Sequence, residues 1–531
     1  MSREYLPVPL PTELDALFGQ YVAAGQAPGL VYGLFGPDGL VHSAGFGTAG
    51  GTTESAAANA AAAPDADTVF PIASISKCFV AAGALLAEGR GLVDLDEPIS
   101  SLLPEVAAAD GACGDHAAPG IRQLLGMGGG LTEDNSWIDP FIGMPTDTLL
   151  AAVAGGLAYS NPPGVAFEYS NLGYALVGAA LARAAGAPLA DWLAENLFAP
   201  LGLASTRFDS TPLPARARRA TGFTLDADGA WTGFAPATSD AYAAAAGMQS
   251  TVRDLAAWAT YLGSAFRQAD PGGPLSAAAR RAMQRVHYLY PPAETPPGSA
   301  TGPFHATSGY GLGLVVREDP IWGTIAAHSG GLPGFVLYLV WHPDSGHGVV
   351  VLTNSHRGSP ALLAEDALTR ALRSNNAAAR TIRLWPQTAR LLEAAEALIR
   401  AWDDDAAGEI LAPNVAFDRP LDERRADIER QTAAVGPLRP PRTSQERPDL
   451  VVAASPAHVT WAIAAERGEL LCHIHVTPLR EAQIQTLEVI ARPYDVPRGT
   501  RLAQLPAHGG IRAVPAPARH ARVIWPGETA W

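Results

Sequence analysis

Hydrophobic and polar residues follow two different kinds of pattern along this chain, and the change falls near residue 380. In the N-terminal part, hydrophobic residues recur at helical spacing through Leu14, Phe18 and Val22, and the sequence APGL ends that pattern. Two apolar runs, LVYGLF and LVHSAGF, then flank the turn sequence GPDG and predict a β-hairpin. A second helix is predicted from about residue 74 to residue 88, directly after VFPIAS.

The stretch from about residue 95 to residue 320 alternates short helical patterns with Pro- and Gly-rich loops, which predicts a largely helical sub-domain. Strand signals return in GTIAAHSGGLPGFVLYLVWHPDSGHGVVVLTN, and the helix PALLAEDALTRALRS follows. Helices before the first hairpin and after the last strands predict one antiparallel sheet covered by terminal helices. We therefore expect residues 1–378 to form an α+β domain with this sheet, flanking helices and a helical sub-domain.

Residues 379–531 predict a second, accessory α+β domain. The helical patterns QTARLLEAAEALIRAWDDD and LDERRADIERQTAAV precede four strand-like runs, LVVAASP, HVTWAIAAE, ELLCHIHVTP and IQTLEVIA. This order of elements resembles the cone-shaped nuclear-transport-factor-2-like (NTF2-like) fold, with a lipocalin-like barrel as the alternative. We expect this domain to shape or cover the active site of the first, because it carries no complete catalytic set of its own.

Composition narrows the classes of function. The chain has 531 residues, 37 basic and 52 acidic, for a net charge of −15, and no cluster of basic residues tracks a phosphate backbone, so nucleic acid is not an expected partner. The start of the chain, MSREYLPVPLPTELD, lacks the pattern of a signal peptide, and no apolar stretch is long enough to span a bilayer. We expect a cytoplasmic protein with no membrane partner. Residues 51–64 are of low complexity, and we expect them to form a surface insertion.

Few residues suit a metal or a cofactor. Cys78, Cys113 and Cys472 are too scattered for a disulfide framework or a zinc site and are interpreted as packing residues. His473 and His475 share one face of a predicted strand and are interpreted as structural. The sequence contains no H-E-x-x-H motif, no G-x-S-x-G motif and no phosphate-binding loop. We predict neither a metal nor a cofactor.

Lys77 is the only lysine in the chain, so the other 36 of the 37 basic residues are arginines. An arginine could supply the same charge, but a guanidinium does not lose its proton in a protein, whereas a desolvated lysine does. Ser74 precedes Lys77 by three residues, which on a helix places both on one face. A serine hydroxyl needs a nearby base to become a nucleophile. This pair predicts a nucleophilic serine with a lysine base.

Three short motifs occur in order: SISK at 74–77, YSN at 169–171 and HSG at 328–330. Together with the flanking sequences FEYSNLGYALVG and HSGGLPGF, they resemble the serine β-lactamase and penicillin-binding-protein superfamily over about residues 10–375. The branch with the greatest similarity contains class C β-lactamases, D-aminopeptidases and related esterases. The resemblance implies the β-lactamase-like fold for the first domain.

The resemblance also implies roles for the second motif. Tyr169 would relay a proton between Ser74 and the leaving group, and Asn171 would position Lys77 and the substrate. YSN also occurs at Tyr159, but that copy runs into PPG and is interpreted as a turn. We therefore assign the motif to Tyr169.

The third motif departs from class C β-lactamases, which have a lysine where this chain has His328. A histidine is mostly neutral near pH 7, so it attracts a substrate carboxylate less and transfers protons more easily. Ser329 and Gly330 would contact the substrate along the strand, with Gly330 leaving space for it. The backbone N–H groups of Gly331 and Ser74 would form the oxyanion hole.

These observations predict a cofactor-independent serine hydrolase that forms an acyl-enzyme at Ser74. Its substrate would be an ester or amide of a small or peptidic molecule, as for a D-aminopeptidase, an amidase or a carboxylesterase. A thioesterase or peptide cyclase of penicillin-binding type and a β-lactamase are alternative activities. A catalytically silent ligand-binding protein is the alternative from another class.

Overall fold

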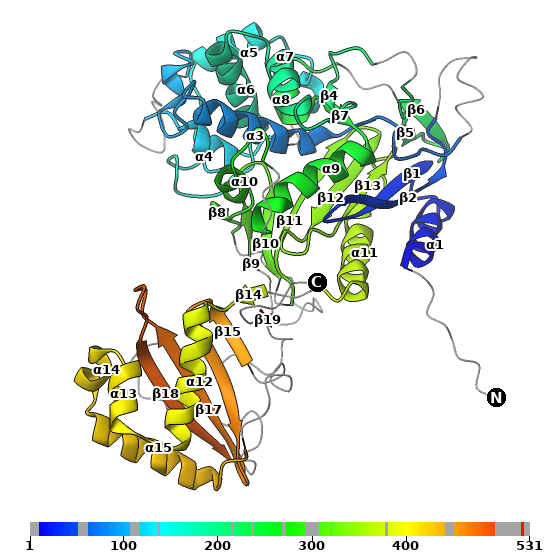
Figure 1. Cartoon of the computed structure of the whole chain (residues 1–531). Helices are drawn as coiled ribbons and strands as arrows, with labels where there is room; N and C mark the ends of the chain where they lie inside the picture. Colours follow the sequence, from blue (N-terminus) through cyan, green and yellow to red (C-terminus); the bar gives the residue numbers. More distant parts are fainter. Residues whose placement is uncertain are drawn as a thin grey trace, which may run out of the picture. The chain divides into compact units, whose positions relative to one another are not determined.

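Two compact units make up the chain, Met1–Ala377 and Ala378–Trp531, and each is described by itself (Figure 1). The structure is a computed structural model. It describes residues 10–50, 62–106, 117–135, 138–213, 217–234, 238–267, 272–291, 307–319, 321–377, 381–440, 451–493 and 522–524.

An eight-stranded antiparallel sheet forms the centre of the first unit, in the order β2-β1-β13-β12-β11-β10-β9-β8. The inner strand β13 has the sequence GVVVLT and is buried along its whole length, as expected for a strand covered on both faces. The strands are β1 (Gly29–Gly36), β2 (Gly39–Gly47), β8 (Tyr288–Leu289), β9 (Thr307–Tyr310), β10 (Val315–Asp319), β11 (Gly323–Leu332), β12 (Phe335–Trp341) and β13 (Gly348–Thr353).

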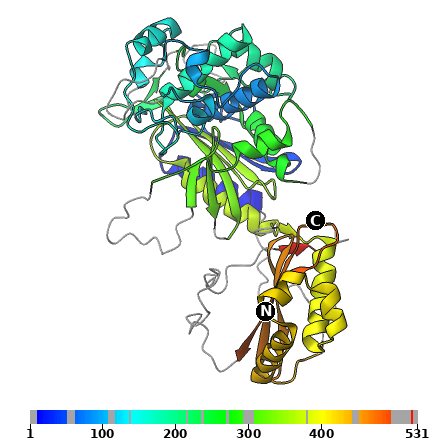
Figure 2. The ribbon, with the colours of Figure 1, turned by 90° about the vertical axis from the view of Figure 1, so that its left-hand side faces the viewer.

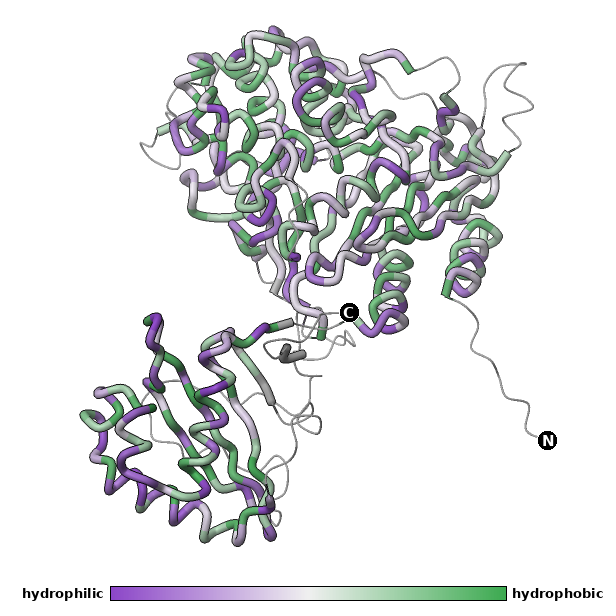
Figure 3. Tube along the Cα trace, in the orientation of Figure 1, coloured by the Kyte–Doolittle hydropathy of each residue, from purple (hydrophilic) through white to green (hydrophobic). Residues whose placement is uncertain are grey.

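Helices cover both faces of this sheet. The terminal helices α1 (Leu10–Ala23) and α11 (Pro360–Ser374) pack together on one face, and α9 (Val252–Gly263) packs on β1 and β13 from the other. Helix α11 turns Ala364, Leu368 and Ala371 into the core, and hydrophobic and hydrophilic residues alternate along it (Figure 3). The predicted antiparallel sheet with flanking helices is confirmed.

The helical sub-domain lies beyond the α9 face (Figure 2). Its long central helices α3 and α6 are mostly buried. Among the described helices none alone is long and apolar enough to cross a membrane; one bent pair, Asn171–Ala185 with Leu189–Phe198, reaches that length and apolarity together. The α-helices are α3 (Ser76–Gly89), α4 (Ile121–Leu125), α5 (Thr146–Ala154), α6 (Asn171–Ala185), α7 (Leu189–Leu193), α8 (Ala243–Ala246) and α10 (Ala277–Met283). The short strands are β3 (Phe70–Pro71), β4 (Arg207–Phe208), β5 (Gly222–Leu225), β6 (Trp231–Phe234) and β7 (Met248–Ser250).

Two predictions about the elements need correction. The helix expected from residue 74 begins as a 3₁₀ turn, η1 (Ala73–Ile75), and becomes α-helical at Ser76. Strands β8 to β10 extend the sheet but lie within the stretch predicted to be largely helical. They were not predicted because they are short and interrupted by glycines in TSGYGLGL. Most of the predicted insertion at 51–64, residues 51–61, lies outside the described residues.

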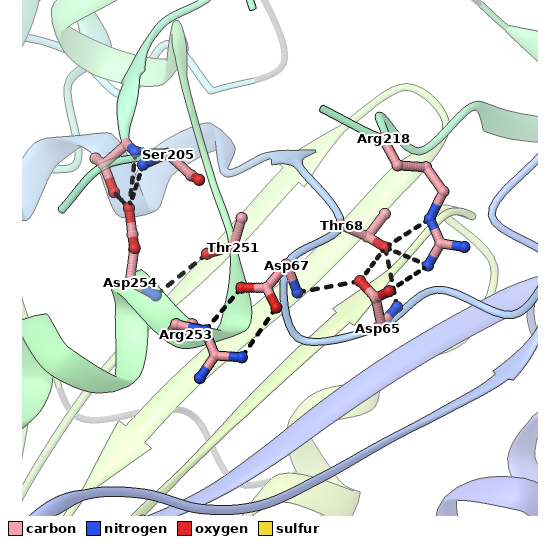
Figure 4. Close-up of polar contacts among 9 residues, drawn as sticks. Asp65, Asp67, Thr68, Ser205, Arg218, Thr251, Arg253 and Asp254 are labelled. Carbon is pink, nitrogen blue, oxygen red and sulfur yellow. Dashed lines mark hydrogen bonds and ion pairs between the residues drawn. The ribbon is translucent and has the colours of Figure 1, made fainter. Parts of the chain in front are cut away.

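Charged side chains hold the segment that leads into β3 and then to Ser74 (Figure 4). Arg253, on α9, donates two hydrogen bonds to the Asp67 carboxylate at 2.7 and 2.9 Å. Asp65 forms an ion pair with Arg218 at 2.9 Å and accepts a hydrogen bond from Thr68 Oγ1 at 2.8 Å. Because these carboxylates are largely exposed, the contacts contribute more to orientation than to stability.

The second unit packs four helices on an antiparallel sheet ordered β15-β16-β17-β18. Along β16 and β17 every second residue is buried, so one face of the sheet carries the core with α12 and α15. The predicted order, helices before antiparallel strands, is observed; the NTF2-like and lipocalin-like alternatives stay predictions. The elements are β14 (Thr381–Arg383), α12 (Pro386–Arg400), α13 (Asp404–Ile410), α14 (Pro413–Asp418), α15 (Leu421–Val435), β15 (Val451–Ser455), β16 (His458–Ala464), β17 (Gly468–Val476), β18 (Ile484–Pro493) and β19 (Arg522–Ile524), which pairs with β14 in parallel.

Both described cysteines are free and buried, as expected for packing residues. Cys78 lies in the core of the first unit, and Cys472 in that of the second. Cys113 lies outside the described residues.

Candidate active site

Ser74 lies on a tightly held turn between β3 and α3, and it is partly exposed. The preceding Ala73 has φ of +48°, a left-handed conformation that is costly for a residue with a Cβ. Ser76 Oγ stabilises this turn by donating to Ala73 O at 2.6 Å and accepting from Met248 N at 3.1 Å. The Ser74 hydroxyl is thus presented on a turn fixed by its neighbours.

Lys77 is fully buried, and its Nζ atom contacts three oxygen atoms. It lies 3.0 Å from Ser74 Oγ, 2.7 Å from Asn171 Oδ1 and 2.9 Å from the carbonyl oxygen of Ala245. Burial lowers the pKa of Lys77 to about 7, although the nearby Asp134 carboxylate acts in the opposite direction. A neutral amine has two hydrogens and one lone pair. The amide and backbone oxygens accept the two hydrogens, which leaves the lone pair for the Ser74 hydroxyl.

Tyr169 lies against both of these groups. Its interaction with the Ser74 side chain acts to lower the pKa of Tyr169, and Lys77 Nζ lies 4.9 Å from the centre of its ring. Burial raises the pKa of Tyr169 above its usual value, so the hydroxyl keeps its proton at neutral pH. In this arrangement the lysine is the group able to accept the serine proton, and the tyrosine is able to donate one.

Asn171 begins helix α6 and is held by Asp134, a residue that the sequence analysis missed. The Asp134 carboxylate accepts from the backbone N–H groups of Asn171 and Leu172, both at 2.7 Å, and from Asn171 Nδ2 at 3.1 Å. These contacts orient the amide so that its oxygen faces Lys77. A carboxylate at a helix N-terminus is also favoured by the helix dipole. In the sequence, Asp134 stands in the loop LTEDNS with no pattern that distinguishes it.

The other YSN copy has different partners. Tyr159 pairs with Leu131 in an isolated β-bridge, and Ser160 donates hydrogen bonds to the Gly130 carbonyl and the Glu168 carboxylate. The structure therefore brings Ser74, Lys77 and the second motif together, as predicted, and assigns the first copy to a loop.

His328 is buried on β11, and both of its ring nitrogens are hydrogen-bonded to the protein. Nδ1 donates to the Ser329 carbonyl oxygen at 2.6 Å, which leaves Nε2 to accept from the Tyr310 hydroxyl at 2.8 Å. Burial, together with the nearby Lys77, lowers the pKa of His328 to about 3, so the ring is neutral. The expected proton-transfer role of His328 needs correction, because neither ring nitrogen is directed at Ser74. The Nε2 atom of His328 is hydrogen-bonded to Tyr310 instead.

Gly330 and Gly331 have different surroundings. A Cβ at Gly330 would lie 2.5 Å from the Ile72 carbonyl oxygen and 3.3 Å from Ala73 Cβ. The missing side chain therefore makes room for the turn that carries Ser74, and not for substrate as predicted. A Cβ at Gly331 would meet nothing within 4 Å.

The end of β11 has a free edge among the described strands. Pairing of β10 with β11 stops at Ala327, so residues 328–332 pair only with β12. Ser329 is exposed on this segment. An unpaired edge offers backbone N–H and C=O groups to a ligand. The oxyanion role of Gly331 and the substrate contact of Ser329 stay predictions.

Comparison with known proteins agrees with this geometry. The family model described as Beta-lactamase matches residues 14–373. The chain belongs to the β-lactamase family. Penicillin-binding protein 4* of Bacillus subtilis (strain 168) is 25% identical over 301 residues, which cover 54% of this chain and 61% of that protein. The match therefore spans less than two thirds of the length of this curated relative. The predicted resemblance is confirmed.

Two solved structures extend the comparison. The octameric penicillin-binding protein homologue from Pyrococcus abyssi has a TM-score of 0.57 and 17% identity, and covers 90% of this chain and 99% of its own. The D-amino acid amidase from Ochrobactrum anthropi SV3 has a TM-score of 0.52 and 25% identity, with 69% and 99% covered. Other solved structures that share the fold include EstCE1, a hydrolase with promiscuous acyltransferase activity, at 22% identity, and a class C beta-lactamase at 17% identity.

Proposed function

We propose that this protein is a cofactor-independent serine hydrolase that cleaves an amide or ester through an acyl-enzyme at Ser74. The observation that carries the proposal is the position of the only lysine in the chain. Lys77 is buried, 3.0 Å from Ser74 Oγ, with a pKa of about 7. A base with a pKa near the working pH is the most effective one for this step.

In the acylation step, Ser74 Oγ forms a bond to the substrate carbonyl carbon while its proton passes to Lys77 Nζ. The bond from that carbon to the leaving nitrogen or oxygen then breaks, and the leaving group takes up a proton through the hydroxyl of Tyr169. Water attacks the acyl carbon in the second step, releases the acid and restores the Ser74 hydroxyl. The N–H groups of Ser74 and Gly331 are proposed to stabilise the oxyanion in both steps.

Because His328 is neutral, it offers no charge to attract a carboxylate, which favours a substrate that has no carboxylate next to His328. A lysine there would offer a permanent positive charge, which a neutral imidazole held by Tyr310 does not. We therefore favour small amides and esters, including D-amino acid amides, over β-lactams. Similarity to the D-amino acid amidase supports this preference.

Labelling with a fluorophosphonate followed by mass spectrometry tests the nucleophile. We expect one adduct, on Ser74, and its loss in a folded Ser74→Ala variant. Label that persists in this variant would overturn the assignment. A panel of nitrophenyl esters, D- and L-amino acid anilides, a thioester and nitrocefin then separates esterase, amidase, thioesterase and β-lactamase activities. A labelled enzyme that turns over nitrocefin fastest would contradict the proposed preference.

A further inference from the structure

Three histidines converge on the outer face of the sheet in the second unit. His458 on β16 pairs directly with His475 on β17, and Thr460 pairs with His473 in the same ladder. Because side chains alternate between the two faces of a strand, all four side chains point away from the core face. The strand register therefore gathers residues that lie far apart in the hairpin sequence.

The rings of this histidine cluster, His458, His473 and His475, are close enough to share a ligand. Their centroids are 3.8, 4.4 and 4.8 Å apart, in edge-to-face arrangements. One nitrogen atom of each ring lies within 4.8 Å of one nitrogen of each other ring. Three nitrogens bound tetrahedrally at zinc–nitrogen distances of 2.0–2.1 Å would be about 3.3 Å apart. Metal binding would therefore draw the nitrogens closer together than the 4.8 Å within which they now lie.

We propose that His458, His473 and His475 form a binding site for a divalent transition-metal ion such as Zn²⁺, with the fourth coordination position open. Imidazole nitrogens suit Zn²⁺, Co²⁺, Ni²⁺ and Cu²⁺. Three protein ligands and an open position are typical of zinc sites that bind a further molecule. The sequence analysis interpreted these histidines as structural, because His458 could be placed beside them only once the strand register was known.

One contact and one unpartnered nitrogen indicate that the cluster is arranged for a ligand. Thr460 Oγ1 lies 2.8 Å from His473 Nδ1, which fixes that ring and leaves Nε2 free to coordinate. His475 Nε2 is buried and has no hydrogen-bond partner among the described residues. Buried polar atoms normally have partners, and a metal ion would supply one here.

A second group of possible ligands, Glu88, Asp94 and Asp96, serves as a contrast. Arg122 lies 2.6 Å from Glu88 and 2.7 Å from Asp96, so these carboxylates already have a cationic partner. No described arginine pairs with the three histidines. We therefore assign metal binding to the histidine cluster alone.

Titration of the full-length, untagged, EDTA-dialysed protein tests the site. Calorimetry with Zn²⁺ is expected to give one ion per chain with a Kd in the micromolar range or tighter, and Co²⁺ should give visible d–d absorption bands. His475→Ala should weaken binding by more than 100-fold, and Thr460→Val by about 10–100-fold, the usual effect of losing an outer-shell partner. His356→Ala, which removes an exposed histidine of the first unit, should bind as the wild type does.

Thermal melts without metal check that each variant is folded, and only folded variants are compared. Absence of saturable one-to-one binding in the wild type would overturn the proposal. Equal affinity of wild type and a folded His475→Ala variant would overturn it as well. Because the readout is metal affinity, its outcome is independent of the proposed hydrolase activity.

Discussion

The Lys77 site of the first unit and the histidine cluster of the second differ in how their polar atoms are paired. Lys77 is completely buried, and its Nζ atom contacts oxygens from Ser74, Asn171 and Ala245. In the histidine cluster the rings are half-exposed, and the buried Nε2 of His475 has no partner within the described part of the chain.

This difference teaches what each arrangement can do. A buried group with every partner in place holds one geometry and one pKa, which suits proton transfer. A half-exposed group with an unused nitrogen suits an external ligand. Substitutions around Lys77 should therefore reduce acylation activity far more than substitutions in the histidine cluster. The following experiments test this from the largest expected effect to the smallest.

Replacing Lys77 with arginine should have the largest effect. Arginine keeps the charge but cannot accept a proton, so acylation should fall by about 10²–10⁴-fold. Stopped-flow acylation with a nitrophenyl ester measures the loss, and thermal melts separate it from unfolding. Lys77→Met, which has a similar stem and no charge, should lose as much activity. A folded Lys77→Arg enzyme at wild-type rate would refute the base assignment.

The pH dependence of acylation should follow the protonation of Lys77. Its pKa is lowered to about 7 by burial, so the base is neutral above pH 7 and protonated below it. The rate should rise with pH up to about 7 and then level off, and at pH 5 it should be roughly 100-fold below the plateau. Single-turnover rates across pH 5–9 measure the profile. A limb centred near the ordinary lysine pKa would contradict the role of burial.

Alanine at Gly330 should disturb the turn that carries Ser74. Its Cβ would lie 2.5 Å from the Ile72 carbonyl oxygen, so the variant should lose about 1–3 kcal/mol of stability, together with much of its activity. Gly331→Ala is the matched control, since its Cβ meets nothing within 4 Å and its N–H is retained. Urea unfolding and acylation rates compare the pair. Equal behaviour of the two variants would count against the close packing at Gly330.

Asp134→Asn should have a smaller effect on rate and a distinct effect on pH. Loss of the charged acceptor at the start of α6 should cost about 1–3 kcal/mol in the free energy of unfolding. The Asp134 carboxylate raises the pKa of Lys77, so its removal should move the rising limb to lower pH. Glu133→Gln, at an exposed neighbouring carboxylate, is the control. An unshifted limb in the folded Asp134→Asn variant would exclude this electrostatic coupling.

The smallest effect is expected from metal removal. The proposed acylation uses only side chains and backbone groups of the first unit, so EDTA treatment and His473→Ala should leave the acylation rate within twofold of wild type. The same ester assay measures it. A tenfold loss in either case would mean that the histidine cluster contributes to hydrolysis.

Local patterns explain which elements were predictable. Helix α11 and the strands β16 and β17 have clear periodicity, and the hairpin of β1 and β2 has two apolar runs around a turn sequence; all were predicted. Strands β8 to β10 were missed because they are held by neighbours in the sheet, and their own sequence is short and glycine-rich. The 3₁₀ start at Ala73 was missed for a similar reason, since contacts with β7 and β11 fix that turn.

By itself the sequence determined the pair of Ser74 and Lys77, because three residues on a helical turn fix their approach. The order of the three motifs also identified Tyr169 and Asn171. Only the tertiary structure decided which groups surround them. Asn171 is separated from Lys77 by 94 residues, and the contacts of Asp134 and Tyr310 depend equally on folding.

The same reason applies to the histidine cluster. His473 and His475 share a face through strand alternation, which the sequence shows, whereas His458 joins them through the register of two paired strands. Register is set by packing of the opposite, hydrophobic face, so a polar cluster on the outer face is a consequence of the core. Local spacing in the sequence thus determined which residues lie together within one helix or strand. Tertiary packing decided which residues from different elements come together.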